Sequence, residues 1–161
     1  MAEQLRLRNF EEFAPTFKSN RQWTDRKKVI EQFLFPGYVF CRLNPEKASP
    51  VLMIRGVANL VGFGEGPVPI DDIEIERVRR MVNSGLLITP WPNLAIGQRV
   101  IIERGPLAGI EGVLESLKGV CRIVVSIDLL KRSVSAEIDR AWVRPIPPPQ
   151  HFPGRSAHPH A

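Results

Sequence analysis

The sequence predicts an α+β fold: a small antiparallel sheet with flanking helices, followed by an all-β, SH3-like barrel. Three observations lead to this prediction. The first half of the 161 residues alternates helix-like with strand-like segments. Residues 86–95 contain two prolines and form a stiff connector. Beyond the connector, short strand-like runs separated by glycines and charged residues follow at regular spacing, which is typical of a small barrel.

Length and charge exclude several classes of protein. At 161 residues the chain is too short for a TIM barrel, which needs about 250 residues. No apolar run approaches the ~18 residues of a membrane span, and a polar segment follows Met1. We therefore expect a soluble, cytoplasmic protein with no membrane partner. The 22 basic and 17 acidic residues give a formal charge of +5, which permits an anionic partner without requiring one.

The elements of the first half are predicted in chain order. A short helix covers residues 2–9, and a polar stretch at 18–28 forms the tip of a β-hairpin. The return strand of the hairpin covers residues 31–43 and is rich in aromatic and β-branched residues. Pro36-Gly37 interrupts this strand, which implies a bulge or an edge position, because proline cannot donate a hydrogen bond to the sheet.

Three further elements precede the connector. A helix-like segment covers residues 44–55, and residues 58–63 form a short strand. Asp71 and Asp72 then cap a helix that runs to about Asn83, with acidic residues first and basic residues later, as the helix dipole favours.

The second half is expected to form the barrel and a tail. Five strand-like runs occupy residues 96–146: RVIIE, GVLES, CRIVVSI, RSVSAEI and WVRPI. The predicted organisation is thus an N-terminal domain at 1–85, a linker at 86–95, the barrel at 96–146 and a tail at 147–161. The tail is rich in proline and has almost nothing to bury, so we expect it to be disordered.

The sequence offers little for catalysis or metal binding. Cys41 and Cys121 each lie in an apolar stretch and are expected to be small buried residues, the alternative being a disulfide or a catalytic thiol. His151, His158 and His160 lie in the tail without Cys or acidic neighbours, so no metal site is predicted. No hydrolase triad, metalloprotease motif or phosphate loop is present, and we expect neither enzymatic activity nor a cofactor.

Two motifs carry a resemblance to a known family. GQRVIIERGPLAGIEGVLESL (residues 97–117) resembles the KOW motif of NusG-type transcription factors and of several ribosomal proteins. FLFPGYVFCRL (33–43) with RGVANLVGFGEGPVPIDDIEIERV (55–78) resembles the NusG N-terminal domain. The two motifs occur in the family's order and cover about residues 1–146. Residues 118–138 most resemble the specialised UpxY and RfaH paralogues, which are antiterminators of long operons.

The resemblance implies a transcription elongation factor. In the family, the N-terminal domain docks an apolar face onto the clamp coiled-coil of RNA polymerase and suppresses pausing or termination. Phe35 and Tyr38 hold the matching positions around the Pro-Gly kink and are the candidate polymerase-binding residues. Their large side chains would make good anchors. The alternative is that they alternate with Phe33 and its neighbours into an ordinary core.

Basic residues at the predicted hairpin tip are the candidate nucleic-acid contacts. They are Arg21, Arg26, Lys27 and Lys28. They could contact phosphates of the non-template DNA strand, and Trp23 among them could stack on a base. A solvated hairpin tip is the alternative for each of them.

The KOW barrel is expected to have a partner of its own. In NusG relatives this partner is termination factor Rho or a ribosomal small-subunit protein. Leu107, Ile110 and Ile127 lie near predicted loops and are the candidate contacts, although they fit the core equally well. RfaH can hide its KOW domain as a helical hairpin. Here the β-branched runs favour a barrel as the resting state, and we predict no fold switch.

The chain departs from the family at its start. Family members begin with a Trp-Tyr-rich strand and a basic loop, whereas this sequence starts within the first helix. We therefore expect a missing first strand and an exposed sheet edge with an apolar face, a hypothesis that the upstream coding sequence would test. We expect a monomeric, operon-specific factor. The alternative is a ribosome-associated protein that binds RNA through its KOW barrel.

Overall fold

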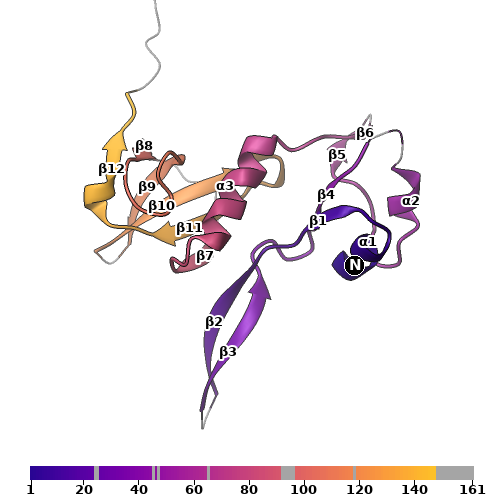
Figure 1. Ribbon diagram of the computed structural model, residues 1–161, viewed down its shortest axis with the longest axis horizontal. Coiled ribbons are helices and arrows are strands. Elements are labelled where there is room, and N and C mark those ends of the chain that lie inside the picture. Colours follow the sequence, from indigo (N-terminus) through magenta and orange to yellow (C-terminus); the bar gives the residue numbers. More distant parts are fainter. Residues whose placement is uncertain are drawn as a thin grey trace, which may run out of the picture.

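The structure has three neighbouring parts and a projecting ribbon. This computed structural model describes residues 1–23, 26–44, 46, 48–64, 66–91, 97–117 and 119–147. A curved six-stranded sheet lies on one side, a group of short elements lies on the other, and helix α3 stands between them (Figure 1). The mixed α+β class predicted from the sequence is confirmed.

The N-terminal group is built from short elements. They are helix α1 (Ala2–Leu7), strands β1 (Glu11–Phe13) and β4 (Phe40–Arg42), helix α2 (Ser49–Leu52), and strands β5 (Gly62–Phe63) and β6 (Gly66–Pro67). Strand β1 pairs with β4, and β5 pairs with β6, both antiparallel. Buried Leu5, Val51 and Ile54 pack α1 and α2 together in a small apolar cluster. The helix expected over residues 44–55 is therefore only one turn long.

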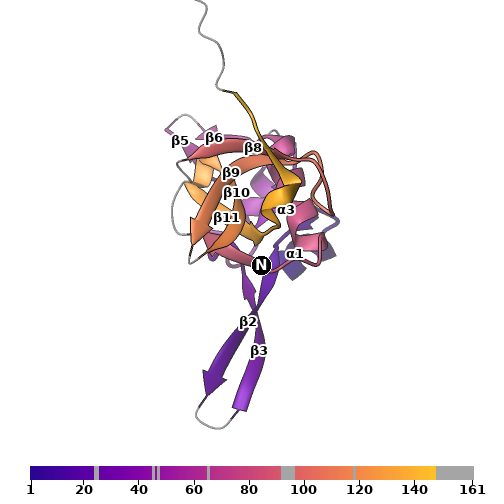
Figure 2. The ribbon, with the colours of Figure 1, turned by 90° about the vertical axis from the view of Figure 1, so that its left-hand side faces the viewer.

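A long β-ribbon projects from this body (Figures 1 and 2). It consists of β2 (Thr16–Trp23) and β3 (Arg26–Phe33), paired antiparallel along their whole length. The hairpin predicted from the polar stretch is thus confirmed. At its base, the Leu34 backbone N–H donates to the carbonyl of Pro15 over 2.9 Å, so the two chains stay paired as they enter the body.

The return strand ends earlier than the sequence predicts. A tight turn follows β3, in which the Tyr38 N–H donates to the Phe35 carbonyl over 3.0 Å. Gly37 has φ +88°, and proline precedes it, as in a type II turn. The expectation of a single strand over residues 31–43 is therefore wrong. The Pro-Gly pair forms a turn between two strands and not a bulge within one strand.

Helix α3 (Asp72–Asn83) forms as predicted. The Asp71 carboxylate caps its first turn by accepting the N–H of Ile73 over 3.0 Å. Val78 and Met81 are fully buried on one side of the helix. Gly85, with φ +74°, lies two residues beyond the helix and allows the chain to turn away.

All five predicted barrel strands are present. They are β8 (Gln98–Ile102), β9 (Glu111–Leu117), β10 (Val120–Ile127), β11 (Arg132–Glu137) and β12 (Val143–Pro145). They form one antiparallel sheet in the order β12-β8-β9-β10-β11, so the KOW region is in its β form. Two short 3-10 turns, η2 (Asp128–Leu130) and η3 (Arg140–Trp142), join its last strands.

The expected connector contains a sixth strand of this sheet. Strand β7 (Ile88–Trp91) pairs antiparallel with β11, and the Thr89 hydroxyl lies 3.0 Å from that of Ser135. Residues 92–96 and the expected tail from residue 148 onward, with its three histidines, lie outside the described residues. The part of the connector that is described therefore belongs to the barrel sheet.

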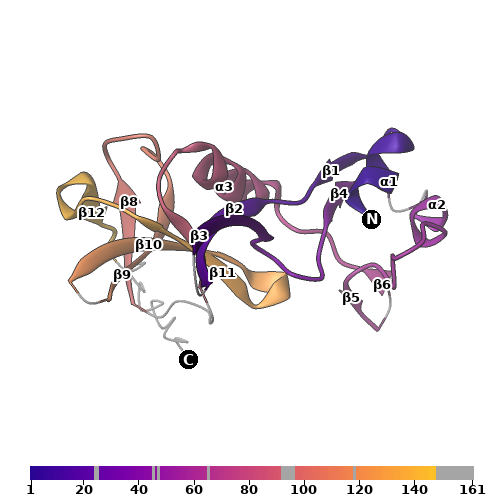
Figure 3. The same cartoon turned by 90° about the horizontal axis from the view of Figure 1, so that it is seen from below.

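One hydrophobic core joins the two halves of the chain. Val78 and Met81 of α3 and Leu34, Phe35 and Phe40 of the N-terminal half belong to the same buried cluster as the inner residues of the barrel. Figure 3 shows α3 between the sheet and the N-terminal group. Arg80 of α3 also donates to the carbonyl of Ala108 in the barrel over 2.6 Å. The barrel is therefore packed onto α3.

Candidate protein-binding site

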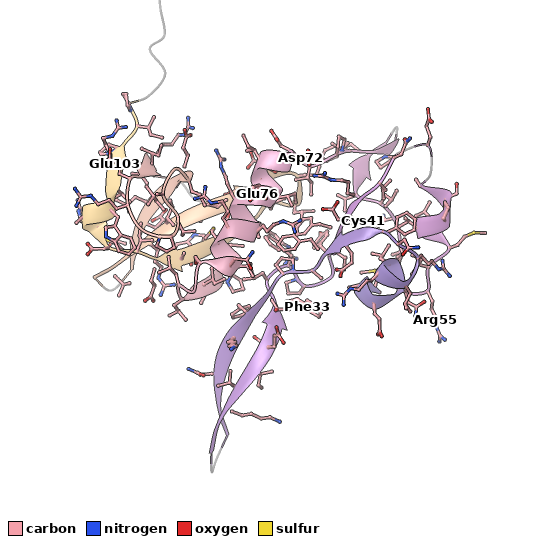
Figure 4. The ribbon with its side chains drawn as sticks, viewed as in Figure 1. Phe33, Cys41, Arg55, Asp72, Glu76 and Glu103 are labelled. Carbon is pink, nitrogen blue, oxygen red and sulfur yellow. The ribbon has the colours of Figure 1, made fainter. Side chains whose placement is uncertain are left out.

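An apolar pocket of about 300 Å³ lies where the N-terminal group, α3 and the barrel meet. One wall is the end of β1 with residues 38–43, including β4, and another is the start of α3 with residues 67–70. Leu129 and Leu130 of turn η2 supply a third. Figure 4 labels two lining residues, Cys41 on β4 and Asp72 at the start of α3. The site is mainly apolar, and charged groups stand at its edge.

The two candidate polymerase-binding residues differ in their exposure. Phe35 is only 1% exposed, and the edge of its ring packs against Phe40 at 5.2 Å between ring centres. Tyr38 is half-buried and lines the pocket, and the Arg132 guanidinium lies 5.2 Å from its ring centre. Tyr38 can therefore contact a ligand directly, while Phe35 supports the pocket from behind.

Ion pairs of both signs surround the pocket. Arg42 lies 3.7 Å from the Glu11 carboxylate and 3.3 Å from that of Asp72. Arg79 lies 3.8 Å from Glu11 and 4.7 Å from the ring centre of Phe13. The pairing side chains of Arg42, Glu11 and Asp72 are more than half exposed. Exposed pairs contribute little to stability, so these groups are free to exchange partners with charges on a bound protein.

Cys41 is a poor nucleophile. Its side chain lines the pocket and is partly buried. Burial first, and then the negative charges of Glu12 and Glu11, raise the pKa of the Cys41 thiol. The reactive thiolate is therefore scarce at neutral pH. Cys121 is also a free thiol, so the two cysteines do not form a disulfide.

The sheet next to the pocket has a free edge. Among the described residues, β1 and β4 pair only with each other. Residues 58–63 were expected to form a strand, but only Gly62 and Phe63 do so. A strand requires a partner for its backbone N–H and carbonyl groups, and residues 58–61 have no paired strand beside them in the described chain. The described chain thus leaves the β1–β4 pair with an unpaired edge, and the missing first strand stays a prediction.

The predicted basic residues lie at the far end of the projecting ribbon. The register pairs Arg21 with Lys28, and Trp23 with Arg26. Because successive residues of a strand alternate between faces, positions 21, 23, 26 and 28 share one face, and Lys27 is on the other. Lys28 is exposed, and the side chains of the other four lie outside the described part of the structure.

The three candidate KOW contacts are core residues. Leu107 and Ile110 are each 1% exposed and Ile127 is 0% exposed, all within the shared core. Their side chains are therefore not at the surface, and of the two alternatives, surface contact or core, the structure shows core residues. Leu129, which does reach the pocket, was not singled out from the sequence. Its one signal there is an apolar pair, Leu129-Leu130, in a turn between two strands.

The described residues contain neither a candidate membrane-spanning helix nor a candidate metal-binding cluster. Within them, no helix is long and apolar enough to cross a membrane. No group of three or more His, Cys, Asp or Glu side chains in the same residues is arranged to hold a metal ion.

Comparison with known proteins finds similarity to NusG proteins. Residues 1–79 match the family model described as "NusG: Transcription termination factor nusG". The transcription termination/antitermination protein NusG of Pseudomonas aeruginosa is 27% identical over 157 residues, covering 91% of this chain and 88% of that protein. The NusG of Thermus thermophilus is 29% identical over 133 residues, covering 73% of this chain and 70% of that protein. The NusG of Lactococcus lactis is 24% identical over 139 residues, covering 82% of this chain and 73% of that protein. NusG proteins are transcription factors and not enzymes, and this chain is a NusG-like protein.

Proposed function

We propose that this protein binds RNA polymerase through the pocket and suppresses pausing or termination during elongation. The observation that carries the proposal is the pocket itself, which is apolar, partly open and edged by exchangeable ion pairs. A helix of a partner that packs an apolar stripe into a groove, with polar groups on either side, needs such a surface. The family resemblance supplies the occupant, the clamp coiled-coil of the polymerase.

Tyr38 is the proposed direct anchor, and Phe35 is the proposed support. The ring of Tyr38 reaches the pocket, and aromatic side chains bury a large area at a low cost in conformational entropy. Phe35 packs against Phe40, which also lines the pocket, so truncation of Phe35 would act by loosening Phe40. We therefore place both residues in the polymerase site, with different roles.

The projecting ribbon is the proposed nucleic-acid contact. Its far end carries Arg21, Arg26, Lys27 and Lys28. The ribbon extends away from β4 and α3, which supply residues to the pocket (Figure 1). Basic residues on a ribbon that extends from the body can reach phosphates of the non-template strand while the pocket holds the polymerase.

The barrel is proposed to recruit a second partner, either Rho or a ribosomal small-subunit protein. Because Leu107, Ile110 and Ile127 are buried, this partner would contact other residues of the barrel surface. We further propose a cytoplasmic monomer that acts on particular operons, as the resemblance of residues 118–138 to the UpxY and RfaH paralogues suggests.

Binding to polymerase tests the proposal. Tagged wild-type protein, Tyr38→Ala and Phe33→Ala are each titrated with bacterial RNA polymerase core enzyme. Phe33 is the matched control, because it is an aromatic residue that is 55% exposed and lies outside the pocket. We expect Tyr38→Ala to weaken binding about tenfold or more and Phe33→Ala to change it little. Equal affinities for all three proteins would refute the proposed site.

The second candidate function is RNA binding on the ribosome through the KOW barrel. The observation in its favour is that all five predicted barrel strands lie in one antiparallel sheet. Co-purification separates the two functions: polymerase subunits support the first, and ribosomal RNA without polymerase supports the second.

A further inference from the structure

The edge of β11 in the barrel sheet is occupied by a strand from the connector. Strand β7 is the last strand in the sheet order, and it pairs antiparallel with residues 133–136 of β11. The Glu137 backbone N–H extends this pairing by donating to the Leu87 carbonyl over 3.1 Å. If β7 were removed, the N–H and carbonyl groups on that side of β11 would have no strand partner, and such an edge readily accepts another strand.

Strand β7 is held mainly by its backbone. Because bonded and non-bonded pairs alternate in an antiparallel ladder, the bond at position 87 places the backbone groups of positions 89 and 91 toward β11, and those of 88 and 90 away from it. Pro90 therefore lacks an N–H only on the outer edge of β7, where it opposes the addition of a seventh strand. Of the four β7 side chains, Ile88, at 8% exposed, is the one in the buried core. Another extended strand with an aliphatic residue in the place of Ile88 could make the same contacts.

A polar cluster lies across the joint between the two strands. The Thr89 hydroxyl of β7 lies 3.0 Å from the Ser135 hydroxyl of β11, and Nη1 of Arg122 on β10 donates to the Thr89 hydroxyl over 3.1 Å. The same Nη1 lies 3.5 Å from the Ser135 hydroxyl, and Nη2 donates to the Glu137 carboxylate over 2.6 Å. Nε of Arg122 is buried and has no hydrogen-bond partner among the described residues. The guanidinium, which has five N–H donors, therefore has donors to spare.

A carboxylate in the place of the Thr89 hydroxyl would suit this guanidinium better. Hydrogen bonds from a guanidinium to a carboxylate are about twice as strong as those to a neutral acceptor. The Arg122 side chain is only 16% exposed, so water competes little for its donors. The edge of β11 thus favours a strand in which an aliphatic residue is followed directly by an acidic one.

We propose that the edge of β11 is a strand-binding site, which β7 fills in the free protein and which a partner fills with an extended strand that carries an aliphatic residue followed by an acidic one. The incoming strand remakes the backbone hydrogen bonds that β7 gives up. Its carboxylate on Arg122 offsets the advantage that β7 has from being part of the same chain. The inference rests on the proposed recruitment of a second partner by the barrel, because it names how that partner is held.

A peptide that imitates β7 tests the exchange. The probe is a fluorescein-labelled peptide of residues 86–91 with Thr89→Asp and Pro90→Val, and its binding to the full chain is followed by fluorescence anisotropy. The Thr89→Pro protein loses the N–H that faces β11, so its β7 competes less, and we expect it to bind the probe at least about tenfold more tightly than the wild type does. Thr89→Val is the matched control, because it loses the hydroxyl but keeps the N–H, and its affinity should stay within about threefold of the wild type.

The acidic residue has its own control. A second peptide, with Thr89→Asn in place of Thr89→Asp, has nearly the same shape without the charge, and it should bind the Thr89→Pro protein about fivefold more weakly. Equal affinities for the two peptides would overturn the acidic requirement. Absence of binding to a Thr89→Pro protein that circular dichroism shows to be folded would overturn the strand site.

A disulfide lock tests the exchange in a protein whose β7 is not weakened. Thr89→Cys and Ser135→Cys are combined in a Cys41→Ser/Cys121→Ser background, since the two native hydroxyls are close enough for their replacements to join. The reduced protein should bind the probe at least about tenfold more tightly than the oxidised protein. Equal binding by the two forms would overturn the exchange, because the lock keeps β7 on β11.

The outcomes separate this inference from the proposed function. If the lock blocks the probe, but the wild-type protein co-purifies with neither Rho nor small ribosomal subunits, the strand site stands and the proposed partners of the barrel are refuted. If Rho or small ribosomal subunits bind the oxidised and reduced proteins equally and the probe binds neither form, recruitment by the barrel remains and the strand site is refuted.

Discussion

Replacement of Met81 in α3 tests whether the helix and the barrel share one core. The side chain is 0% exposed and lies in the cluster that includes the inner barrel residues. Met81→Ala removes three heavy atoms from that cluster and leaves a cavity. Such truncations cost about 2–5 kcal/mol, and we expect about 3 kcal/mol here. For a chain of this size, that loss corresponds to a fall in Tm of roughly 6–12 °C.

The tryptophans of the second half make the assay specific. Trp91 on β7 and Trp142 in turn η3 belong to the barrel, and Trp23→Phe removes the only other tryptophan. Urea unfolding is then followed by fluorescence, which reports on the barrel, and by circular dichroism. Met81→Ala should lower both midpoints together, and the control Ile73→Ala, at a position that is 58% exposed, should shift neither by much. An unchanged fluorescence midpoint for Met81→Ala would refute the shared core.

Two further predictions concern single side chains near the pocket. Asp71→Ala removes the cap of α3 and should lower the free energy of unfolding by about 1 kcal/mol in urea titrations, while Asp71→Ser, which keeps an acceptor, should restore most of it. In a Cys121→Ser protein, Cys41 should react with iodoacetamide at pH 8 more slowly than the same thiol in urea, because the fold raises its pKa. The raised pKa also means that the Cys41 thiol loses its proton at a lower pH in the unfolded chain than in the folded protein. The contribution of Cys41 to the free energy of unfolding is therefore present below about pH 8.5 and is lost as the pH rises further. A thiol that reacts equally fast in both states, or a stability that rises over this pH range, would contradict the second prediction.

Local signals in the sequence were sufficient for elements that stabilise themselves. Asp71 and Asp72 at one end and Gly85 at the other set the limits of α3 through capping and backbone conformation, which involve neighbouring residues only. The hairpin was likewise predicted from the polar residues of its tip, and the five barrel strands from short strand-like runs separated by glycines and charged residues. In each of these cases the deciding interaction is close in sequence or repeats along it.

Elements that depend on a distant partner were predicted poorly. Residues 88–91 contain a proline and look like a linker, yet they form β7, because β11 offers an edge on which Pro90 can lie. Residues 58–61 have the composition of a strand but no paired strand beside them in the described chain. Composition sets how well a segment suits a strand, and the presence of a partner decides whether the strand forms.

The candidate site shows the same limit at the level of side chains. The motif around Pro36-Gly37 points to a segment that lines the pocket, but a strict period of two along this segment would place Phe33 and Phe35 on one face. In the structure Phe33 is 55% exposed and Phe35 is 1% exposed. The turn that begins at Phe35 interrupts the strand, so the alternation of side chains between the two faces does not continue through it. Leu129 reaches the pocket only because the barrel packs on α3, and no local pattern in the sequence reports that packing.

Salt dependence separates the two proposed binding surfaces. The edge of the pocket carries Arg42 and Arg79 against Glu11 and Asp72, already paired with each other, so binding there exchanges ion pairs and should change little with ionic strength. The far end of the ribbon is different, because it concentrates basic residues that would displace counterions from DNA. Each phosphate contact on a single strand contributes a slope of about −0.7 in log affinity against log salt concentration.

The four ribbon residues together therefore contribute a slope of up to about −2.8 to the binding of single-stranded DNA. Replacement of all of them by alanine should remove most of that slope and leave polymerase binding through the pocket nearly unchanged. The replaced residues are Arg21, Arg26, Lys27 and Lys28. A control with the same loss of charge replaces four exposed arginines elsewhere: Arg8, Arg55, Arg104 and Arg140. If the control removes as much of the slope as the ribbon variant, the net charge and not the ribbon attracts DNA, and the ribbon is no specific contact.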